Sequence, residues 1–183
     1  MAKVIVLNGV GSVGKSSTAK ALQALAKAPL LHVSMDAFLE MLPAAMFGDA
    51  DGLLFEPLVE DGKPSIAIRT GPVVARTLAG MRHAVAAMAG QGNDLIVDEV
   101  LIGEGEAAEY RTLLSGHDLR FVGLFAPLEV LEAREKARGD REIGLARWQF
   151  QRVHAGVDYD LTIDTLESSP EQSARRIAEA FGL

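Results

Sequence analysis

The sequence contains no cysteine, which excludes disulfides, thiolate metal sites and cysteine nucleophiles. It has no apolar run long enough to span a bilayer, and its beginning shows neither a charged leader nor a signal-length apolar core, so we expect a cytoplasmic protein with no membrane partner. Basic residues are in the minority, because 18 Lys and Arg stand against 25 Asp and Glu, a net charge of −7. Nucleic acid and anionic membranes attract basic patches, so neither is expected as a large partner. Any anion-binding site must therefore be a local cluster of basic residues.

The pattern of apolar runs predicts the fold class. About half of the 183 residues are apolar, enough for one compact domain over residues 1–183, which could also form a homo-oligomer. Continuous apolar runs, typical of strands buried on both faces, cover residues 3–8, 30–33, 94–98, 120–125 and 160–164. Helical patterns cover residues 18–27, 72–89, 106–115, 128–138, 143–154 and 170–181. Strands that alternate with helices predict a three-layer, doubly wound parallel α/β sheet.

A glycine-rich turn joins the first strand to the first helix. The segment Gly9-Val-Gly-Ser-Val-Gly14-Lys15-Ser16 fits the P-loop pattern, and its strand and helix neighbours make a chance match the weaker interpretation. Its backbone N–H groups can turn toward a phosphate, Lys15 can bridge the β- and γ-phosphates, and the Ser16 hydroxyl can ligate Mg²⁺. The residues predicted to bind ATP here are Gly9, Gly11, Ser12, Val13, Gly14, Lys15, Ser16 and Ser17.

Acidic residues follow two of the other predicted strands. Asp98 ends the strand 94–98, where P-loop proteins usually carry a second acid for Mg²⁺, and Glu99 could share that role. A solvated loop carboxylate is the alternative for both. Asp36 follows the strand 30–33 and could accept the proton of an attacking hydroxyl, or it could merely cap a helix beginning at Ala37. Position alone favours neither interpretation of Asp36.

Basic residues gather between the last two predicted strands. Arg134, Arg138 and Arg141 recur at helical spacing, with Gly139-Asp140 as an interruption that suggests a hinged lid over residues 134–152. Guanidinium groups on such a lid can contact phosphates or stack on adenine while the lid excludes water. The alternative is a solvated helix face paired with Glu132, Glu135 and Glu142.

Residues 37–72 interrupt the alternation of strands and helices, and we expect them to bind the acceptor. The part from 48 to 72 is rich in Gly, Pro and Asp, with a possible hairpin at Asp61-Gly62. An apolar pocket could draw on Phe38, Leu42, Met46, Phe47 and Phe55, although a core would contain the same residue types.

Taken together, the motifs resemble those of the chloramphenicol phosphotransferases, P-loop kinases that transfer the γ-phosphate of ATP to a hydroxyl of that antibiotic. The likeness covers nearly the whole chain and rests on residues 5–9 with Gly14-Lys15-Ser16, and on residues 33–36, 96–100, 134–141, 153–160 and 164–165. It implies that Asp36 is the general base and that Arg134, Arg138 and Arg141 are lid arginines. It also implies an adenine seat at Asp164 and Thr165, and structural roles for His154 and Tyr159. Glu99 departs from the pattern, where a second aspartate is expected.

The expected function is therefore a Mg²⁺- and ATP-dependent transfer of phosphate to a hydroxyl of a small molecule. Asp36, Lys15, Arg138 and Arg141 would be catalytic, and Ser16 with Asp98 would hold Mg²⁺. One alternative is a nucleoside or sugar-type kinase, but an anionic acceptor would need a basic pocket, and residues 37–72 contain only Lys63 and Arg69 as basic residues. Another is a nucleotide-dependent switch, which would need no acceptor base.

Overall fold

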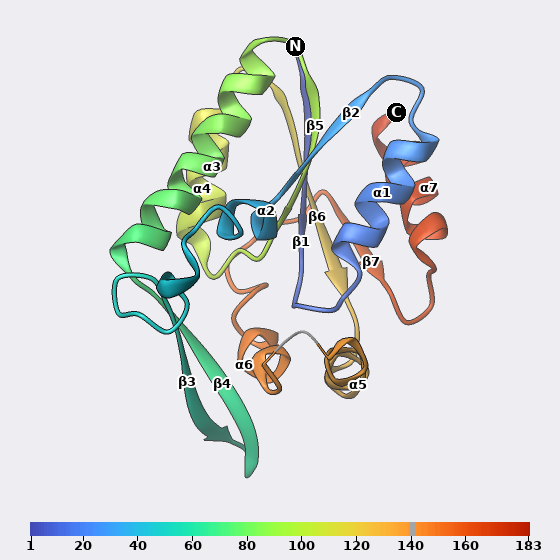
Figure 1. Ribbon diagram of the computed structural model, residues 1–183. Coiled ribbons are helices and arrows are strands. Elements are labelled where there is room, and N and C mark those ends of the chain that lie inside the picture. The colour runs from blue at the N-terminus through green and yellow to red at the C-terminus, as the bar shows by residue number, and fades with distance from the viewer. Residues whose placement is uncertain (140–141) are drawn as a thin grey trace.

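The central sheet has five parallel strands in the order β2-β5-β1-β6-β7 (Figure 1). The computed structural model describes residues 1–139 and 142–183. The strands are β1 (Lys3–Asn8), β2 (Leu30–Ser34), β5 (Asp94–Glu99), β6 (Asp118–Phe125) and β7 (Leu161–Asp164). Each predicted apolar run is therefore a strand of this sheet, and the doubly wound α/β prediction is confirmed.

Helices cover both faces of the sheet, which explains why the strands are apolar without alternation. On one face lie α1 (Lys15–Leu25) and α7 (Pro170–Phe181); on the other lie α3 (Pro72–Gly90) and α4 (Glu104–Leu113) (Figure 1). Strand β1 supplies both cores, because Ile5 and Leu7 pack toward the first pair of helices, and Val4 and Val6 toward the second. In the described part of the chain, no helix is long and apolar enough to cross a membrane.

Three strand ends meet at the carboxyl edge of the sheet. Asn8 at the end of β1 is in register with Glu99 at the end of β5, and Ser34 at the end of β2 is in register with Asp98. The loop after β1, the start of the short helix α2 (Met35–Leu39) and the end of β5 therefore lie beside one another. This edge is where ligands bind in open α/β sheets.

The segment between α2 and α3 forms an antiparallel hairpin outside the main sheet (Figure 1). A short helical turn (Ala44–Met46) leads to β3 (Leu53–Glu60) and β4 (Lys63–Thr70). The turn at Asp61 and Gly62 has positive φ angles of 52° and 74°, so the predicted hairpin is confirmed.

Two helices, α5 (Leu128–Arg138) and α6 (Leu145–Phe150), follow β6 and precede β7 in the chain. Both lie at the carboxyl edge of the sheet (Figure 1). The sequence predicted a helix over 143–154, but α6 is shorter at both ends. It begins only after Gly144, whose φ of +110° is left-handed, and the N–H groups of Gly144 and Ala146 both donate 2.8 Å hydrogen bonds to the buried Glu135 carboxylate. These bonds fix the start of α6 on α5.

The hairpin is joined to α6 by close backbone contact. The N–H of Ile66 donates to the carbonyl oxygen of Gly144 at 3.1 Å, and Arg152 pairs with Glu60 at 3.0 Å. A side chain at Gly144 would place its Cβ 3.0 Å from Ser65 Cα, so the two backbones approach closely because the residue is glycine. We call the contact of Ser65 and Ile66 with Gly144 the hairpin–helix clasp.

Candidate active site

The loop between β1 and α1 has the geometry of an anion cradle. Gly14 has a φ of +103°, and a Cβ at Gly9 would lie 2.7 Å from the carbonyl oxygen of Leu124, so glycine is needed at both positions. Lys15 begins α1 and is buried, with its Nζ donating to the carbonyl oxygens of Gly9 at 2.8 Å and Val10 at 3.2 Å. Backbone N–H groups, a helix N-terminus and an ammonium group therefore converge on one loop, which is an arrangement suited to phosphate.

Ser16 and Asp98 meet beside this loop. The Ser16 hydroxyl donates to Asp98 Oδ2 at 2.5 Å. Burial alone raises the pKa of Asp98, but the neighbouring His32, Lys15 and Ser16 together outweigh burial and hold that pKa below its usual value. Asp98 is therefore an ionised, buried carboxylate next to a hydroxyl, and the alternative of a solvated loop carboxylate is wrong for it.

This pair fits a magnesium ion better than a softer metal. Mg²⁺ typically takes one or two protein oxygens and fills its other positions with water and phosphate oxygens. Among the described residues, no group of three His, Cys, Asp or Glu side chains could enclose a metal. His32 Nε2 lies 3.6 Å from Asp98 Oδ2, is buried, and has no hydrogen-bond partner, so an ordered ligand near Asp98 would also satisfy it.

Glu99 points away from this pair into the opposite core. It accepts hydrogen bonds from Arg82 at 2.9 Å and from the Tyr110 hydroxyl at 2.5 Å, and it is 1% exposed. Burial raises the pKa of Glu99 to about 7, although Tyr110 and Arg82 act in the other direction. Adjacent residues of a strand face opposite sides, so only Asp98 reaches Ser16.

Asp36 lies in the first turn of α2, across from the glycine-rich loop. The helix begins at Met35 with Ser34 at the cap position, so the alternative that Asp36 caps a helix starting at Ala37 is wrong. Asp36 is half-buried and lines the same cleft as Lys15, Ser16 and Asp98.

Two of the three predicted lid arginines, Arg134 and Arg138, belong to the described part of the chain, and they differ in their contacts. Arg134 donates to Thr165 through two bonds, to its hydroxyl at 3.0 Å and to its carbonyl oxygen at 2.8 Å. Arg134 and Arg138 both line the cleft, and the exposed Asp164 accepts a bond from the N–H of Leu166. Arg141 lies outside the described residues.

The acidic residues near the lid are not simply solvated partners of these arginines. Glu135 is buried and holds the start of α6, as described above. Glu132 pairs with Arg147 of α6, which is itself buried. Both carboxylates therefore join α5 to α6, and the interpretation of this stretch as a solvated helix face is wrong for them.

One cleft of about 1350 Å³ is lined by Lys15, Ser16, Asp36, Asp98, Arg134 and Arg138. It runs from the glycine-rich loop and lid, past Asp36, to the hairpin and the first turns of α3 and α4. Of the five apolar residues suggested for an acceptor pocket, Phe47 and Phe55 line the cleft, whereas Phe38 packs against the core. The other apolar residues that line the cleft are Met35, Leu39, Leu53, Ile68, Val74, Leu78, Val100, Ile102, Leu145 and Trp148.

Two cleft residues carried no signal in the sequence. The Oε1 atom of Gln149 in α6 accepts a 2.7 Å hydrogen bond from the N–H of Gly11, so a lid helix touches the glycine-rich loop directly. Glu106, in the first turn of α4, also lines the cleft. Neither residue is part of a local motif, and only the folded chain brings them to the site.

His154 and Tyr159 are half-buried and form a polar network with the buried Asn8, which ends β1 just before the glycine-rich loop. Asn8 donates to the Tyr159 hydroxyl at 2.7 Å, that hydroxyl lies 2.7 Å from His154 Nδ1, and the His154 ring stacks on Phe125 at 3.9 Å. Asn8 also donates to the carbonyl oxygen of Val153 and accepts from the N–H of Leu101. The network links three loops at the carboxyl edge, which supports the structural roles expected for both residues.

This network should make stability depend on pH. Burial, with the charge of Lys15, lowers the pKa of His154 from 6.5 to about 4. As the pH falls, the unfolded chain therefore takes up the proton first, so stability present above about 6.5 is lost as the pH falls toward 4. We expect urea unfolding to give a smaller free energy at pH 5 than at pH 7, and His154→Asn to reduce that difference. An equal difference in the variant would show that other groups cause it.

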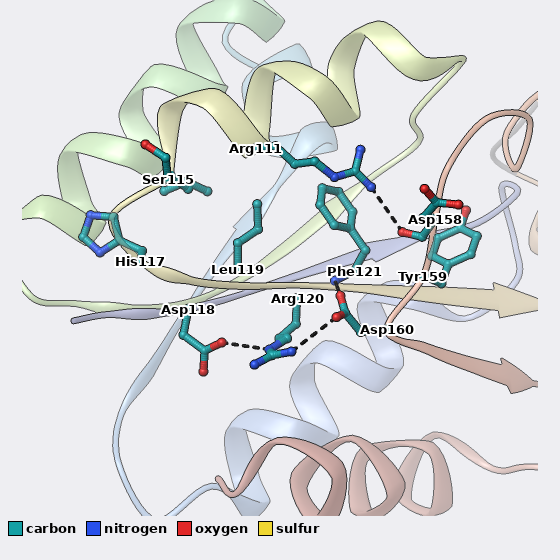
Figure 2. A pocket seen from close by; sticks show the side chains of 11 residues that line it. Arg111, Ser115, His117, Asp118, Leu119, Arg120, Phe121, Asp158, Tyr159 and Asp160 are labelled. Carbon is teal, nitrogen blue, oxygen red and sulfur yellow. Dashed lines mark hydrogen bonds and ion pairs between the residues drawn. The ribbon is translucent and has the colours of Figure 1, made fainter.

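A second hollow, of about 570 Å³, lies at the start of β6 (Figure 2). Arg120 is held there between Asp118 at 2.8 Å and Asp160 at 3.3 Å, and Arg111 lies over the ring of Phe121. Asp118 is in register with Lys3 at the start of β1, so the hollow is at the opposite end of the sheet from the glycine-rich loop. Because the hollow lies at the other end of the sheet and Arg120 is already paired with acidic residues, we do not assign it to the candidate active site.

The fold and the loop at its edge define the class of protein: a P-loop kinase fold. The Mycobacterium tuberculosis APS kinase CysC, solved in complex with AMPPNP and APS, matches with a TM-score of 0.65 at 18% identity, over 100% of this chain and 98% of that chain. Shikimate kinase from Aquifex aeolicus matches with a TM-score of 0.60 at 14% identity, over 98% of this chain and 96% of that chain. At these identities the likeness shows the fold alone.

The family is more specific. The family model described as "Chloramphenicol phosphotransferase-like protein" matches residues 2–182, and the chain belongs to this family, as its motifs predicted. The Mycobacterium tuberculosis protein named "Putative O-phosphotransferase Rv2636" is 29% identical over 184 residues, which cover 98% of this chain and 82% of that protein. Family and fold together indicate a P-loop kinase or phosphotransferase.

Proposed function

We propose that the protein transfers the γ-phosphate of ATP to a hydroxyl of chloramphenicol or a similar small molecule, with Mg²⁺ as cofactor. The observation that carries the proposal is that a single cleft contains the phosphate-type loop with Lys15, the Ser16–Asp98 pair and the carboxylate of Asp36. A phosphoryl transfer needs these three elements and little else, since positioning and charge stabilisation supply most of its catalysis.

Each group then has one task. The acceptor hydroxyl oxygen forms a bond to the γ-phosphorus while the bond from that phosphorus to the bridging oxygen of ADP breaks, and Asp36 takes the hydroxyl proton. Lys15 binds the phosphates and stabilises the charge that moves onto the leaving oxygen. When bound, Mg²⁺ would neutralise phosphate charge, and Ser16 and Asp98 would hold it.

The lid and the turn after β7 would complete the nucleotide site. Arg134 lines the cleft and is bonded to Thr165, so we propose that the adenine binds beside Arg134, Asp164 and Thr165. Arg138 lines the cleft, and with Arg141 it would neutralise the transferred phosphate. Gly9, Gly11, Ser12, Val13, Gly14 and Ser17 belong to the loop and first helical turn that would surround the phosphates.

A sugar or nucleoside kinase on the same scaffold is the second candidate, since proteins of this fold include shikimate kinase and APS kinase. An anionic acceptor fits this cleft poorly, because none of the described residues that line it near α2, the hairpin, α3 and α4 is basic. A switch protein without acceptor chemistry would not need Asp36 beside the phosphate site.

The test is product detection with purified protein, Mg-ATP and chloramphenicol, by ³¹P NMR and mass spectrometry. A phosphorylated antibiotic, formed in step with ADP, would support the proposal. If ADP forms at the same rate with and without any acceptor, the protein is a switch or a simple ATPase. If sugars or nucleosides are phosphorylated and the antibiotic is not, the second candidate is correct.

A further inference from the structure

The end of the cleft away from the phosphate loop is built in two layers by α3 and α4. In the inner layer, Arg82 of α3 and Tyr110 of α4 both bond to the buried carboxylate of Glu99. One turn earlier on each helix, at i−4 and therefore on the same face, are Leu78 and Glu106. Both line the cleft, so they form the outer layer that a bound molecule would touch.

Among the described residues, 1–139 and 142–183, Glu106 makes no ion pair. Arg82 of the neighbouring helix is already bonded to Glu99 at 2.9 Å and to Glu109 at 2.6 Å. Burial raises the pKa of Glu106, and its charge in turn raises the pKa of Glu99. Three acidic side chains therefore share one arginine at this end of the cleft.

The rest of this half of the cleft is apolar or acidic. Asp36 and Glu40 of α2 and Glu99 of β5, which is bonded to Arg82, are its other ionisable side chains in the described structure, and no lysine or arginine lines it. Between Asp36 and Glu106 the walls are apolar, with Leu39, Phe55, Val74 and Leu78 among them. The cleft therefore presents a carboxylate at the reacting end, an apolar middle and a second carboxylate at the far end.

We propose that Glu106 is a specificity residue that binds a protonated amine of the acceptor, so that the substrate class is an amphiphilic amino alcohol rather than a hydroxy acid. The proposal rests on the proposed function and adds the far end of the acceptor to it. A cation beside Glu106 gains a charge-assisted hydrogen bond in a partly desolvated site, whereas a carboxylate there would meet only like charge. An apolar spacer of the acceptor fits the walls between the two ends.

The sharpest test uses three acceptors that keep the diol and amide of chloramphenicol and differ only at the far end of the aromatic ring. In place of the nitro group they carry an aminomethyl group, which is protonated at neutral pH, its neutral N-acetyl amide, or its anionic N-succinyl half-amide. We expect kcat/KM to fall in that order, with the amine preferred over the succinyl compound by roughly 10-fold or more, as expected for a hydrogen bond to a charged group. Equal values, or preference for the neutral or the anionic compound, would overturn the proposal.

The variant Glu106→Gln should remove most of the preference for the amine by raising its KM, while the value for the neutral amide changes little. The matched control is Glu104→Gln, since Glu104 is in the same helix turn, is exposed and lies outside the cleft. Retention of the full preference in Glu106→Gln, or its equal loss in Glu104→Gln, would contradict the assignment. If the protein phosphorylates none of the three compounds but does phosphorylate another hydroxyl acceptor, amine and acid forms of that acceptor are compared in the same way. Preference for the acid form would overturn the proposal. Failure with every acceptor would instead count against the proposed function.

Discussion

Replacement of Asp36 by asparagine is expected to lower kcat by about 10²–10⁴-fold, the usual contribution of a general base. The amide has nearly the same shape but cannot accept the hydroxyl proton. Asp36 lies on α2 rather than in the phosphate loop, so the affinity for ATP should remain near the value of the unchanged protein. Initial rates of product formation, with calorimetric titration of a non-hydrolysable ATP analogue, separate the two quantities.

The control for this variant is Asp61→Asn at the turn of the hairpin. Asp61 is exposed, lies outside the cleft and has a φ of 52°, which asparagine tolerates well. Its kcat should be unchanged. Full activity of Asp36→Asn would remove Asp36 from the chemistry and favour a protein that binds nucleotide without transferring phosphate to an acceptor.

Replacement of Lys15 by alanine is expected to lower kcat by roughly 10²–10³-fold, as for loss of one preorganised charge or donor at the reacting phosphate, and also to weaken ATP binding. Lys15 is 8% exposed and its Nζ is held by two carbonyl oxygens of the loop, so its ammonium group is fixed where the phosphates would lie. Unlike Asp36→Asn, this variant should affect nucleotide affinity and turnover together.

Two further variants make the result interpretable. Lys15→Met keeps the aliphatic stem and tests whether loss of packing, rather than loss of charge, causes the effect. Lys20→Ala removes an exposed lysine of the same helix that lies outside the cleft and should change neither quantity. If Lys15→Met binds and turns over ATP normally, the loop does not use its lysine as proposed.

The fold was predictable from the sequence because its signals are local. Strands buried on both faces must be continuously apolar, and a glycine-rich turn between such a strand and a helix has few other uses. The errors fall where local signals are weak. Helix α2 has five residues, too few for a periodic pattern, so its start was placed two residues late and Asp36 was considered as its cap.

The site was predictable only in part for the same reason. Ser16 follows from the P-loop motif and Asp98 from its position at the end of β5, and their side chains lie 2.5 Å apart, whereas their binding of Mg²⁺ stays a prediction. Gln149 reaches Gly11 across 138 positions of the chain, and Glu106 reaches the cleft because α3 and α4 pack side by side. Such contacts depend on tertiary packing, which no local pattern encodes.

The clasp between the hairpin and α6 bears on how this scaffold can be re-engineered. The hairpin is not an independent unit of specificity, because Ile66 is bonded to Gly144, and that glycine caps the helix whose Gln149 accepts a hydrogen bond from the phosphate loop. A hairpin transplanted from a relative would bring its own backbone against Gly144 and could shift α6 with it. To exchange acceptor specificity, the hairpin and residues 142–152 should therefore be transplanted as one unit. Directed evolution should show paired substitutions on the two sides of the hairpin–helix clasp.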